Sequence, residues 1–198
     1  MATTDLGTWA PMPVDEVAAA FGEAPFRWWF AGGHALELHL GRSWRAHDDI
    51  DVGIRRDDAP ALRELLDGWN VHVAAAGDLR PWAGEALVEA RHENNLWCRR
   101  RLDDPWALDV IVGEGDGDRW RYRRDPRIEL PWAEAVLATA DGLPYLAPDV
   151  QLLFKSKGLR PKDRTDAAEV FPHLDPRRRH RLAGWLAPDH PWQALLRR

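Results

Sequence analysis

The sequence contains a single cysteine, Cys98, and no long apolar run. One cysteine cannot form an internal disulfide, and Cys98 has no partner at metal-ligand spacing, so we interpret it as a buried or half-buried side chain without a catalytic role. Residues 1–13 lack the basic start and apolar middle of a signal peptide, and no stretch is long and apolar enough to cross a bilayer. These absences predict a cytoplasmic protein that does not bind a membrane.

Several catalytic motifs are also missing. None of the eight histidines stands in an H-x-x-H or H-E-x-x-H spacing, so no zinc site is predicted. A G-x-x-x-x-G-K-[ST] loop and a G-x-S-x-G elbow are absent, which excludes P-loop and serine-hydrolase classes. Tryptophan is abundant instead, and the twelve are spread from Trp9 to Trp192, which favours packing in the core for most of them.

Charge is distributed unevenly along the chain, which carries a net charge of −5. Residues 149–198 hold 11 Lys and Arg against 6 Asp and Glu, whereas residues 1–148 hold 16 against 26. An acidic surface over residues 1–148 would favour a cationic small molecule as partner; solvated charge without a partner is the alternative. Nucleic acid is disfavoured as a partner of this part, since it lacks the basic stripe of a phosphate-backbone binder.

The segment 26–54 has the most informative pattern. Residues 26–30 are aromatic and bulky, as in a strand, and Gly32 and Gly33 follow, where the backbone can approach a ligand closely. Residues 34–40 predict a helix that ends at Gly41. Free N–H groups at the start of such a helix, together with the positive end of its dipole, can form a binding site for phosphate oxygens.

Two aspartates follow on the next predicted strand. Apolar residues at 50, 52 and 54 alternate with Asp49, Asp51 and Gly53, which is the two-residue period of a half-buried strand. Asp49 and Asp51 should therefore project from one face, where each raises the pKa of the other unless a cation lies between them. Magnesium suits this position, because it prefers one or two carboxylates together with substrate phosphates. A chance Asp-x-Asp at a strand edge is the alternative.

The order of these motifs resembles that of the DNA polymerase beta-like nucleotidyltransferases and, more narrowly, of aminoglycoside O-nucleotidyltransferases and lincosamide nucleotidyltransferases. The resemblance covers residues 29–55 and is carried by Gly32-Gly33-His34-Ala35, Gly41-Arg42 and His47-Asp48-Asp49-Ile50-Asp51. It implies an α/β fold in which a mixed sheet is flanked by helices. It also implies a Mg²⁺ site on Asp49 and Asp51, and a nucleoside triphosphate with its phosphates near Gly32, Gly33 and Arg42.

Residues 106–112 predict a second informative strand, in which Asp109 stands alone among apolar side chains. A lone carboxylate there must be paired, hydrogen-bonded or bound to metal. In the nucleotidyltransferases that the motifs resemble, a third carboxylate on a neighbouring strand faces the first two, and Asp109 is the matching position. By this resemblance Asp109 would take the acceptor's proton or share the metal. The alternative is a structural ion pair with an arginine such as Arg99 or Arg121.

The chain has only three lysines, Lys155, Lys157 and Lys162, all within eight residues. A compact ammonium suits a phosphate as a point charge, whereas the planar guanidinium of arginine demands more room. The spacing from Lys155 to Asp166 is also similar to a lysine-rich C-terminal helix motif of several nucleotidyltransferase families, in which the basic residues lie toward the triphosphate. A solvated charged face is the alternative for each lysine.

Outside the site, helices and strands alternate up to residue 146. Helices are predicted over 14–21, 59–66 and 130–139, and strands over 71–73, 86–88, 95–98 and 120–124. From Ala147 onward the apolar spacing indicates helices, so we predict a catalytic domain over 1–146 and a C-terminal helical subdomain over 147–198. The arginine-rich run 177–181 is interpreted as a solvated helix face, with RNA or membrane contact as the alternative.

Together these features predict a magnesium-dependent nucleotidyltransferase. By resemblance, it would transfer a nucleoside monophosphate, most simply AMP from ATP, to a hydroxyl of a small cationic acceptor such as an aminoglycoside-like antibiotic. Pyrophosphate would leave. Three alternatives stay open: a toxin- or antitoxin-type nucleotidyltransferase that acts on tRNA or a partner protein, a pseudo-enzyme that binds nucleotide without turnover, and a binding module indifferent to magnesium.

Overall fold

The computed structural model describes residues 6–196; residues 1–5, part of the segment considered for a signal peptide, and residues 197–198 lie outside the described residues. The strands are β1 (Trp28–Phe30), β2 (Asp51–Arg55), β3 (Asn70–Ala75), β4 (Asp78–Pro81), β5 (Asn95–Arg99), β6 (Leu108–Asp116), β7 (Arg119–Arg121), β8 (Glu129–Pro131), β9 (Val136–Ala138) and β10 (Pro144–Leu146). They form one mixed sheet in the order β4-β3-β5-β6-β2-β1-β10-β9, with β7 and β8 branching from β6.

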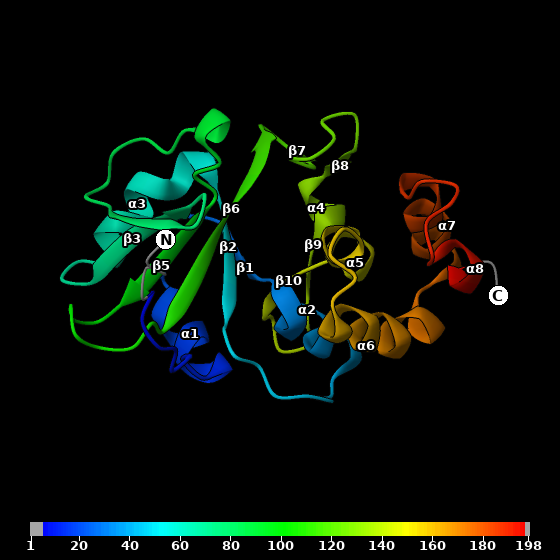
Figure 1. Cartoon of the computed structure of the whole chain (residues 1–198), viewed down its shortest axis with the longest axis horizontal. Coiled ribbons are helices and arrows are strands. Elements are labelled where there is room, and N and C mark those ends of the chain that lie inside the picture. Colours follow the sequence, from blue (N-terminus) through cyan, green and yellow to red (C-terminus); the bar gives the residue numbers. More distant parts are fainter. Residues whose placement is uncertain (1–5, 197–198) are drawn as a thin grey trace.

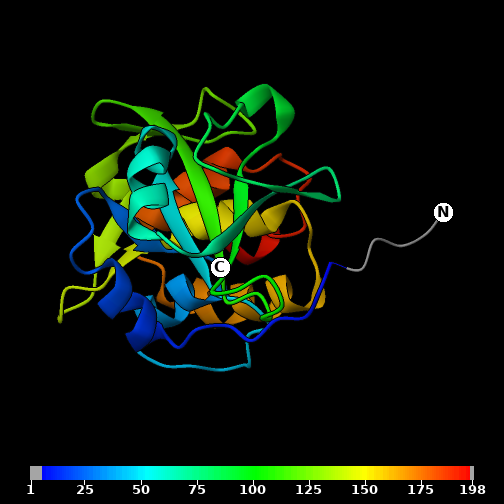
Figure 2. The ribbon, with the colours of Figure 1, turned by 90° about the vertical axis from the view of Figure 1, so that its left-hand side faces the viewer.

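Helices flank this sheet, so the prediction of an α/β fold is confirmed (Figure 1). They are α1 (Val14–Phe21), α2 (Gly32–Leu40), α3 (Ala59–Leu65), α4 (Trp132–Ala135), α5 (Pro148–Ser156), α6 (Pro161–Val170), α7 (Pro176–Trp185) and α8 (Gln193–Leu196). In Figure 1, α1 and α3 lie on the left and α6 to α8 form the right-hand end, while α5 packs against α2, α6 and α7. Figure 2 looks onto the side that carries α3 and shows the C-terminal helices behind the strands. Within residues 6–196, no helix has the length and apolar character needed to span a membrane.

The segment 26–54 forms the strand, helix and strand that the sequence predicts, as β1, α2 and β2. Gly41 ends α2 in the left-handed conformation, and its N–H donates to the carbonyls of Glu37 and Leu38, as expected of a helix C-cap. The strand β2 runs antiparallel to β1 and parallel to β6. Because β2 and β6 are parallel and paired in register, the residues at their N-terminal ends are neighbours.

Apolar residues of the two central strands fill the core. Ile50, Val52 and Ile54 are fully buried, and so are Leu108 and Val110 on the adjacent strand. The alternation read from residues 50–54 is therefore confirmed, and it holds the intervening aspartates at the surface of the sheet. Cys98 is also buried in this core, as the sequence suggested.

The observed elements differ from the prediction in several places. Residues 86–88 form no strand, because Leu87 O accepts from Arg56 and the N–H of Val88 donates to Glu93, so side chains take the place of a strand partner. The helix predicted over 130–139 is limited to α4, because Leu137 pairs with Tyr145 of β10 and continues the sheet. The strands β4, β9 and β10 were not predicted, since each is only three or four residues long.

The arginine-rich run 177–181 is not simply a solvated face. Arg178 and Arg181 each lie 2.7 Å from a carboxylate oxygen of Asp149, which has no exposed side-chain surface. Arg177 and His180 are exposed. The interpretation is therefore wrong for Arg178 and Arg181, which anchor α7 to the start of α5.

Candidate active site

Asp51 and Asp109 lie side by side at the N-terminal ends of the central strands β2 and β6. They are direct partners in the register of the parallel strands β2 and β6, and Asp49 precedes β2 by two residues. The three carboxylates line one hollow of about 200 Å³, whose other lining residues are Gly33, Arg45, Lys155, Arg160 and Lys162. The structure thus brings together the three aspartates singled out from the sequence and places cations opposite them.

Burial and mutual repulsion shift the pKa of Asp51 and that of Asp109. Burial, and after it the neighbouring Asp49, raise the pKa of Asp51 to about 7. Burial also raises the pKa of Asp109 well above its usual range, with Asp51 adding to the rise and a hydrogen bond from Asn95 opposing it. Such a cluster is held ionised most easily by a cation that touches the carboxylates.

The donor set fits a magnesium ion. In the described part of the chain, the ion pairs of the nearby cations go to other acids, and none involves the three aspartates. Asp109 instead accepts two hydrogen bonds from Nδ2 of Asn95, at 3.0 and 3.1 Å. Ionised, unpaired oxygen ligands that face a hollow are what Mg²⁺ requires.

The alternative role of Asp109, as a structural ion pair with Arg99 or Arg121, is wrong. Arg99 donates to Asn70 and to the carbonyl of Asp104, and Arg121 lines a different hollow. Asp109 is therefore a buried carboxyl group held by an amide, and within residues 6–196 it has no ion-pair partner that would compensate its charge when ionised.

Gly32 and Gly33 make room for side chains of the site itself. A Cβ on Gly32, whose φ is +64°, would lie 1.9 Å from Oδ2 of Asp51. A Cβ on Gly33 would lie 2.2 Å from a guanidinium nitrogen of Arg45 and 2.3 Å from Cε1 of His47. The expectation of free N–H groups at this helix start is wrong for Gly32, whose N–H donates to Oε1 of Gln151 at 2.9 Å.

The three lysines separate in space. Lys155 is buried, with Nζ 2.8 Å from Asp166 and 3.5 Å from Asp163. The half-buried Lys162 lines the carboxylate hollow together with Lys155. Lys157 is exposed and lines another groove. The solvated-face alternative is therefore wrong for Lys155, which lies inside the fold.

Arg42 lies apart from the carboxylates. Its guanidinium pairs with Glu169 of α6, and its side chain lines a groove that also includes His34, Glu37 and Tyr145. The structure therefore places Arg42 beside the groove along α2, and not in the hollow of Asp51.

Asp166 joins the hollow to the C-terminal helices. It is fully buried and accepts hydrogen bonds from Nε1 of Trp44 and from the guanidinium of Arg45, the latter at 2.8 and 3.0 Å. Burial would raise the pKa of Asp166, but the bonds from Arg45, Lys155 and Trp44 hold it at about 2. Asp166 is thus an ionised anchor for two cations of the hollow.

Sequence reasoning assigned no role to several residues of this site. Arg45 and Arg160 line the hollow. Arg45 lies between Arg42 and His47 in the segment that carries the resemblance, and Arg160 is one of the basic residues of the lysine-rich motif, so both stood in the segments singled out although neither was named as a site residue. Asn95 and Gln151 hold Asp109 and Gly32, but no local pattern marks them. Their roles depend on the register of β5 against β6 and on the packing of α5 over α2.

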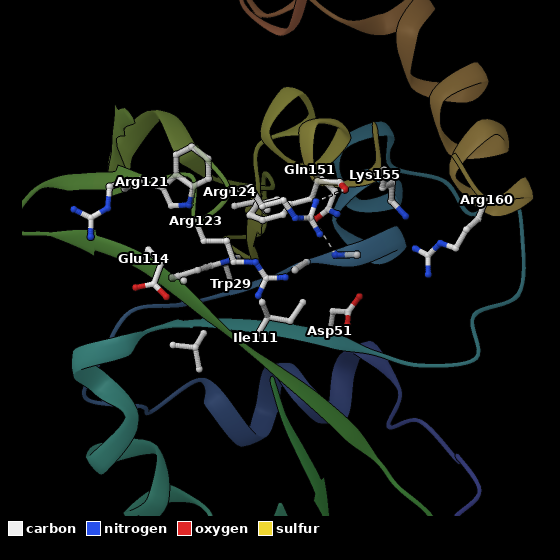
Figure 3. Close-up of a pocket in the computed structure, with 17 residues that line it drawn as sticks. Trp29, Asp51, Ile111, Glu114, Arg121, Arg123, Arg124, Gln151, Lys155 and Arg160 are labelled. Atoms are coloured by element: carbon white, nitrogen blue, oxygen red, sulfur yellow. Dashed lines mark hydrogen bonds between the residues drawn. The ribbon is translucent and has the colours of Figure 1, made fainter. Parts of the chain in front are cut away.

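A second hollow of about 190 Å³ opens beside Asp51 (Figure 3). Its lining is aromatic and basic, and includes Trp29, Trp120, Phe154, Arg121, Arg123 and Arg124. Arg123 points into it near Ile111, and burial lowers the pKa of its guanidinium. Of the two acids in the lining, Glu114 is neutralised by Arg56. An aromatic anion would match this chemistry.

Comparisons with known proteins agree with this geometry. A family profile described as aminoglycoside-2''-adenylyltransferase matches residues 13–170. Curated 2''-aminoglycoside nucleotidyltransferases of Klebsiella pneumoniae and Escherichia coli are 40% identical over 58 residues, which is 28% of this chain. The match spans only about a third (33%) of the length of those relatives.

Two solved structures share the fold. ANT(2'')-Ia in complex with adenylyl-2''-tobramycin has a TM-score of 0.56 at 14% identity, covering 87% of this chain and 94% of that one. The lincosamide antibiotic adenylyltransferase LnuA, lincomycin-bound, has a TM-score of 0.54 at 17% identity, covering 79% and 95%. At these identities the likeness is one of fold.

Proposed function

The chain belongs to the family described as aminoglycoside-2''-adenylyltransferases, and on that premise we propose that it transfers a nucleoside monophosphate to a hydroxyl of a small acceptor. The donor is proposed to be ATP with Mg²⁺, and the acceptor an aminoglycoside-like antibiotic. One observation carries the proposal: Asp51 and Asp109 are neighbours on parallel strands and share a hollow with Asp49 and with cations from α5 and α6.

Asp49, Asp51 and Asp109 would hold the magnesium. The bound ion would neutralise charge on the triphosphate and favour departure of pyrophosphate. Lys155, Arg160 and Lys162 line the same hollow and would attract the remaining phosphate charge. The proposal keeps the division into a catalytic domain over residues 1–146 and a C-terminal helical subdomain over 147–198. In this division the C-terminal subdomain contributes all three cations.

Asp109 is proposed as the general base. An acceptor hydroxyl would form the new bond from its oxygen to the α-phosphorus, the bond from that phosphorus to the bridging oxygen would break, and the hydroxyl proton would pass to Asp109. In the metal-free protein, burial and Asp51 raise the pKa of Asp109. A bound cation would keep the carboxylate ionised, which is the form that accepts a proton. Asn95 donates to both oxygens of Asp109 and fixes its orientation.

The second hollow is proposed to take the nucleoside of the donor. It shares Asp51, Lys155 and Arg160 with the carboxylate hollow, so a nucleotide could extend from one hollow to the other. Its aromatic side chains suit a base, and its arginines suit phosphate or sugar oxygens. The phosphate contacts expected of Gly33 and Lys162 remain part of this proposal, whereas Arg42 and Lys157 would act only on a ligand that reaches beyond the hollow.

A specific observation favours a second candidate acceptor. A groove of about 780 Å³ adjoins Asn95, and its lining includes Arg123, Arg124, His92 and Lys157 against one acid, Glu89. A basic groove next to the proposed base would repel a polycationic antibiotic and attract an anionic acceptor. The second candidate is therefore transfer to an anionic hydroxyl compound, of which tRNA is the macromolecular case.

One assay separates these candidates. The purified chain is incubated with α-labelled ATP, GTP, CTP or UTP and magnesium, together with an aminoglycoside and lincosamide panel, bulk tRNA or buffer alone. Label that moves to an aminoglycoside, with release of pyrophosphate, supports the first proposal. Label on tRNA alone supports the second. Absence of transfer to every acceptor, with nucleotide still bound, would leave a nucleotide-binding protein without turnover.

A further inference from the structure

A second cluster of metal-ligating side chains lies close to the carboxylate hollow, since Gly33 lines the hollow and its α-carbon approaches the ring of His47. His34 and Glu37 stand three residues apart on α2, and His47 comes from the segment between α2 and β2. One ligand atom from each lies within 4.8 Å of the other two. The imidazole rings of His34 and His47 are stacked, with centroids 4.0 Å apart. Three side chains of ligand type therefore converge from two elements.

His47 carries an unsatisfied buried nitrogen at the centre of this cluster. Its side chain is only 8% exposed, and Nε2 lies 3.0 Å from Oε1 of Glu37. That approach lacks the alignment of a hydrogen bond, and Nε2 has no other hydrogen-bond partner among residues 6–196. A buried ring nitrogen whose contact with an acid is not an aligned hydrogen bond calls for a physical reason, and an ion shared with Glu37 is one.

We propose that His34, Glu37 and His47 form a second metal site, which binds a divalent transition ion of the zinc class. Two imidazoles and one carboxylate are a common donor set for Zn²⁺ and are unsuited to Mg²⁺, which prefers oxygen. A tetrahedral zinc with bonds of ~2.0–2.2 Å separates its ligand atoms by roughly 3.4 Å. Ligand atoms up to 4.8 Å apart would move inward to reach that separation, and the 3.0 Å approach of His47 to Glu37 would open slightly. The stacked rings of His34 and His47 would turn so that a nitrogen of each faces the ion.

The cluster is accessible from a groove. His34 and Glu37 both line an open groove of about 810 Å³ that runs past Gly41 and Ser43. An ion could enter from this side, and water or a small ligand could take the fourth position. Glu37 also accepts hydrogen bonds from Ser43 and from the N–H of Trp44, which orient its carboxylate as outer contacts commonly orient metal ligands.

Such a site would link two elements of the active site. His47 precedes Asp49 by two residues, and α2 begins at Gly32 against Asp51. An ion bound across α2 and the following segment would therefore hold that segment in place. The inference does not depend on the proposed transfer, because it rests on different side chains and a different class of metal.

The test is calorimetric titration of Zn²⁺ into the tag-free chain, with Mg²⁺ present in excess to occupy the oxygen site. We expect one equivalent to bind in wild type. His34→Ala removes a direct ligand, so it should weaken binding by at least the roughly 10–100-fold that loss of an outer contact to a ligand costs. His39→Ala is the matched control, since His39 lies on the same helix and lines the same groove but is outside the cluster.

Two further measurements distinguish this site from the carboxylate hollow. Asp51→Asn should bind zinc as wild type does; if it abolishes binding while His34→Ala does not, zinc occupies the carboxylate hollow and the proposal is overturned. Co²⁺ is the spectroscopic probe, and its visible bands should show tetrahedral coordination in wild type that is lost in His34→Ala and in Glu37→Gln. Absence of zinc binding by folded wild-type protein, or equal affinity in wild type and His34→Ala, would also overturn it.

Discussion

Gly32→Ala adds one methyl group at the point where α2 meets the carboxylate of Asp51. If the geometry of Asp51 governs transfer, this small change should be among the most damaging in the chain. The substitution introduces no charge and removes no donor, because the N–H that binds Gln151 belongs to the backbone. Its effect therefore reports position alone.

The structure gives the size of the disturbance. The new Cβ would lie 1.9 Å from Oδ2 of Asp51 and 2.9 Å from its Cγ, whereas ordinary contact begins at 3.4 Å, so the two groups must separate by about 1.5 Å. A displacement of 1 Å at a reacting site can cost about 100-fold in rate. We therefore expect kcat/KM to fall by at least ~100-fold. The left-handed backbone at φ +64° adds a loss of about 1–2 kcal/mol in the free energy of unfolding.

Gly41→Ala is a closely matched control. Gly41 has the same φ of +64°, and nothing lies within 4 Å of a Cβ placed there. Urea denaturation should show the loss caused by the left-handed backbone in both variants, with a further loss of about 1–3 kcal/mol in Gly32→Ala from the contact with Asp51. Initial rates of nucleotide transfer should fall only in Gly32→Ala. Calorimetric titration of Mg²⁺ gives a second readout of the carboxylates. Equal kcat/KM in the two variants would refute the role given to Asp51.

Other substitutions and pH test the remaining assignments. Asp109→Asn should lower turnover by about 10²–10⁴-fold, the usual contribution of a general base, while MgATP affinity in a binding titration should fall by less than turnover does; an unfolded variant or an unchanged rate would contradict this. Lys162→Ala should weaken MgATP binding by about 1.5–3 kcal/mol, as expected for a charge-assisted hydrogen bond, whereas the exposed Lys157→Ala should bind nearly as wild type does. In the metal-free chain the pKa of Asp51 is raised to about 7, above the ~4 of an unfolded aspartate. The folded state then holds the extra proton, so the free energy of unfolding should fall as pH rises from about 4 to about 7. If the free energy of unfolding of the wild type did not change over this pH range, or if Asp51→Asn showed the same dependence on pH as the wild type, the raised pKa of Asp51 would be contradicted.

The sequence was sufficient to predict the carboxylate hollow. The alternation around residue 51 depends only on the two-residue period of a strand, and it survives in the structure because apolar residues at 50, 52 and 54 are fully buried. Local patterns of this kind do not require knowledge of which strands pair. The lone Asp109 in an apolar strand indicated only a carboxylate that must be paired, hydrogen-bonded or bound to metal; its place facing Asp49 and Asp51 was implied by the resemblance to nucleotidyltransferases.

Contacts made across the fold could not be predicted in this way. Arg42 and Lys162 look equally suited to phosphate in the sequence, yet only Lys162 lines the hollow. Asn95 meets Asp109 because β5 pairs with β6, and nothing in residues 93–97 indicates that register. The short strand β9 was predicted as helix from local pattern alone. That prediction failed because the pairing of β9 with β10, which follows after a turn, outweighs local propensity.

The buried Asp166 explains how the basic C-terminal helices can serve an acidic site without neutralising it. A fully buried carboxylate is costly unless it is well paired, and Asp166 takes Arg45 from the segment before β2 and Lys155 from α5. Asp163 likewise holds Arg160. These cations would otherwise form ion pairs with Asp49 and Asp51. Their ion pairs with Asp163 and Asp166 hold them at the wall of the hollow instead. The three carboxylates proposed for catalysis remain free of ion-pair partners within the described residues, which is the condition for binding a metal, while the held cations stay close enough to attract a triphosphate.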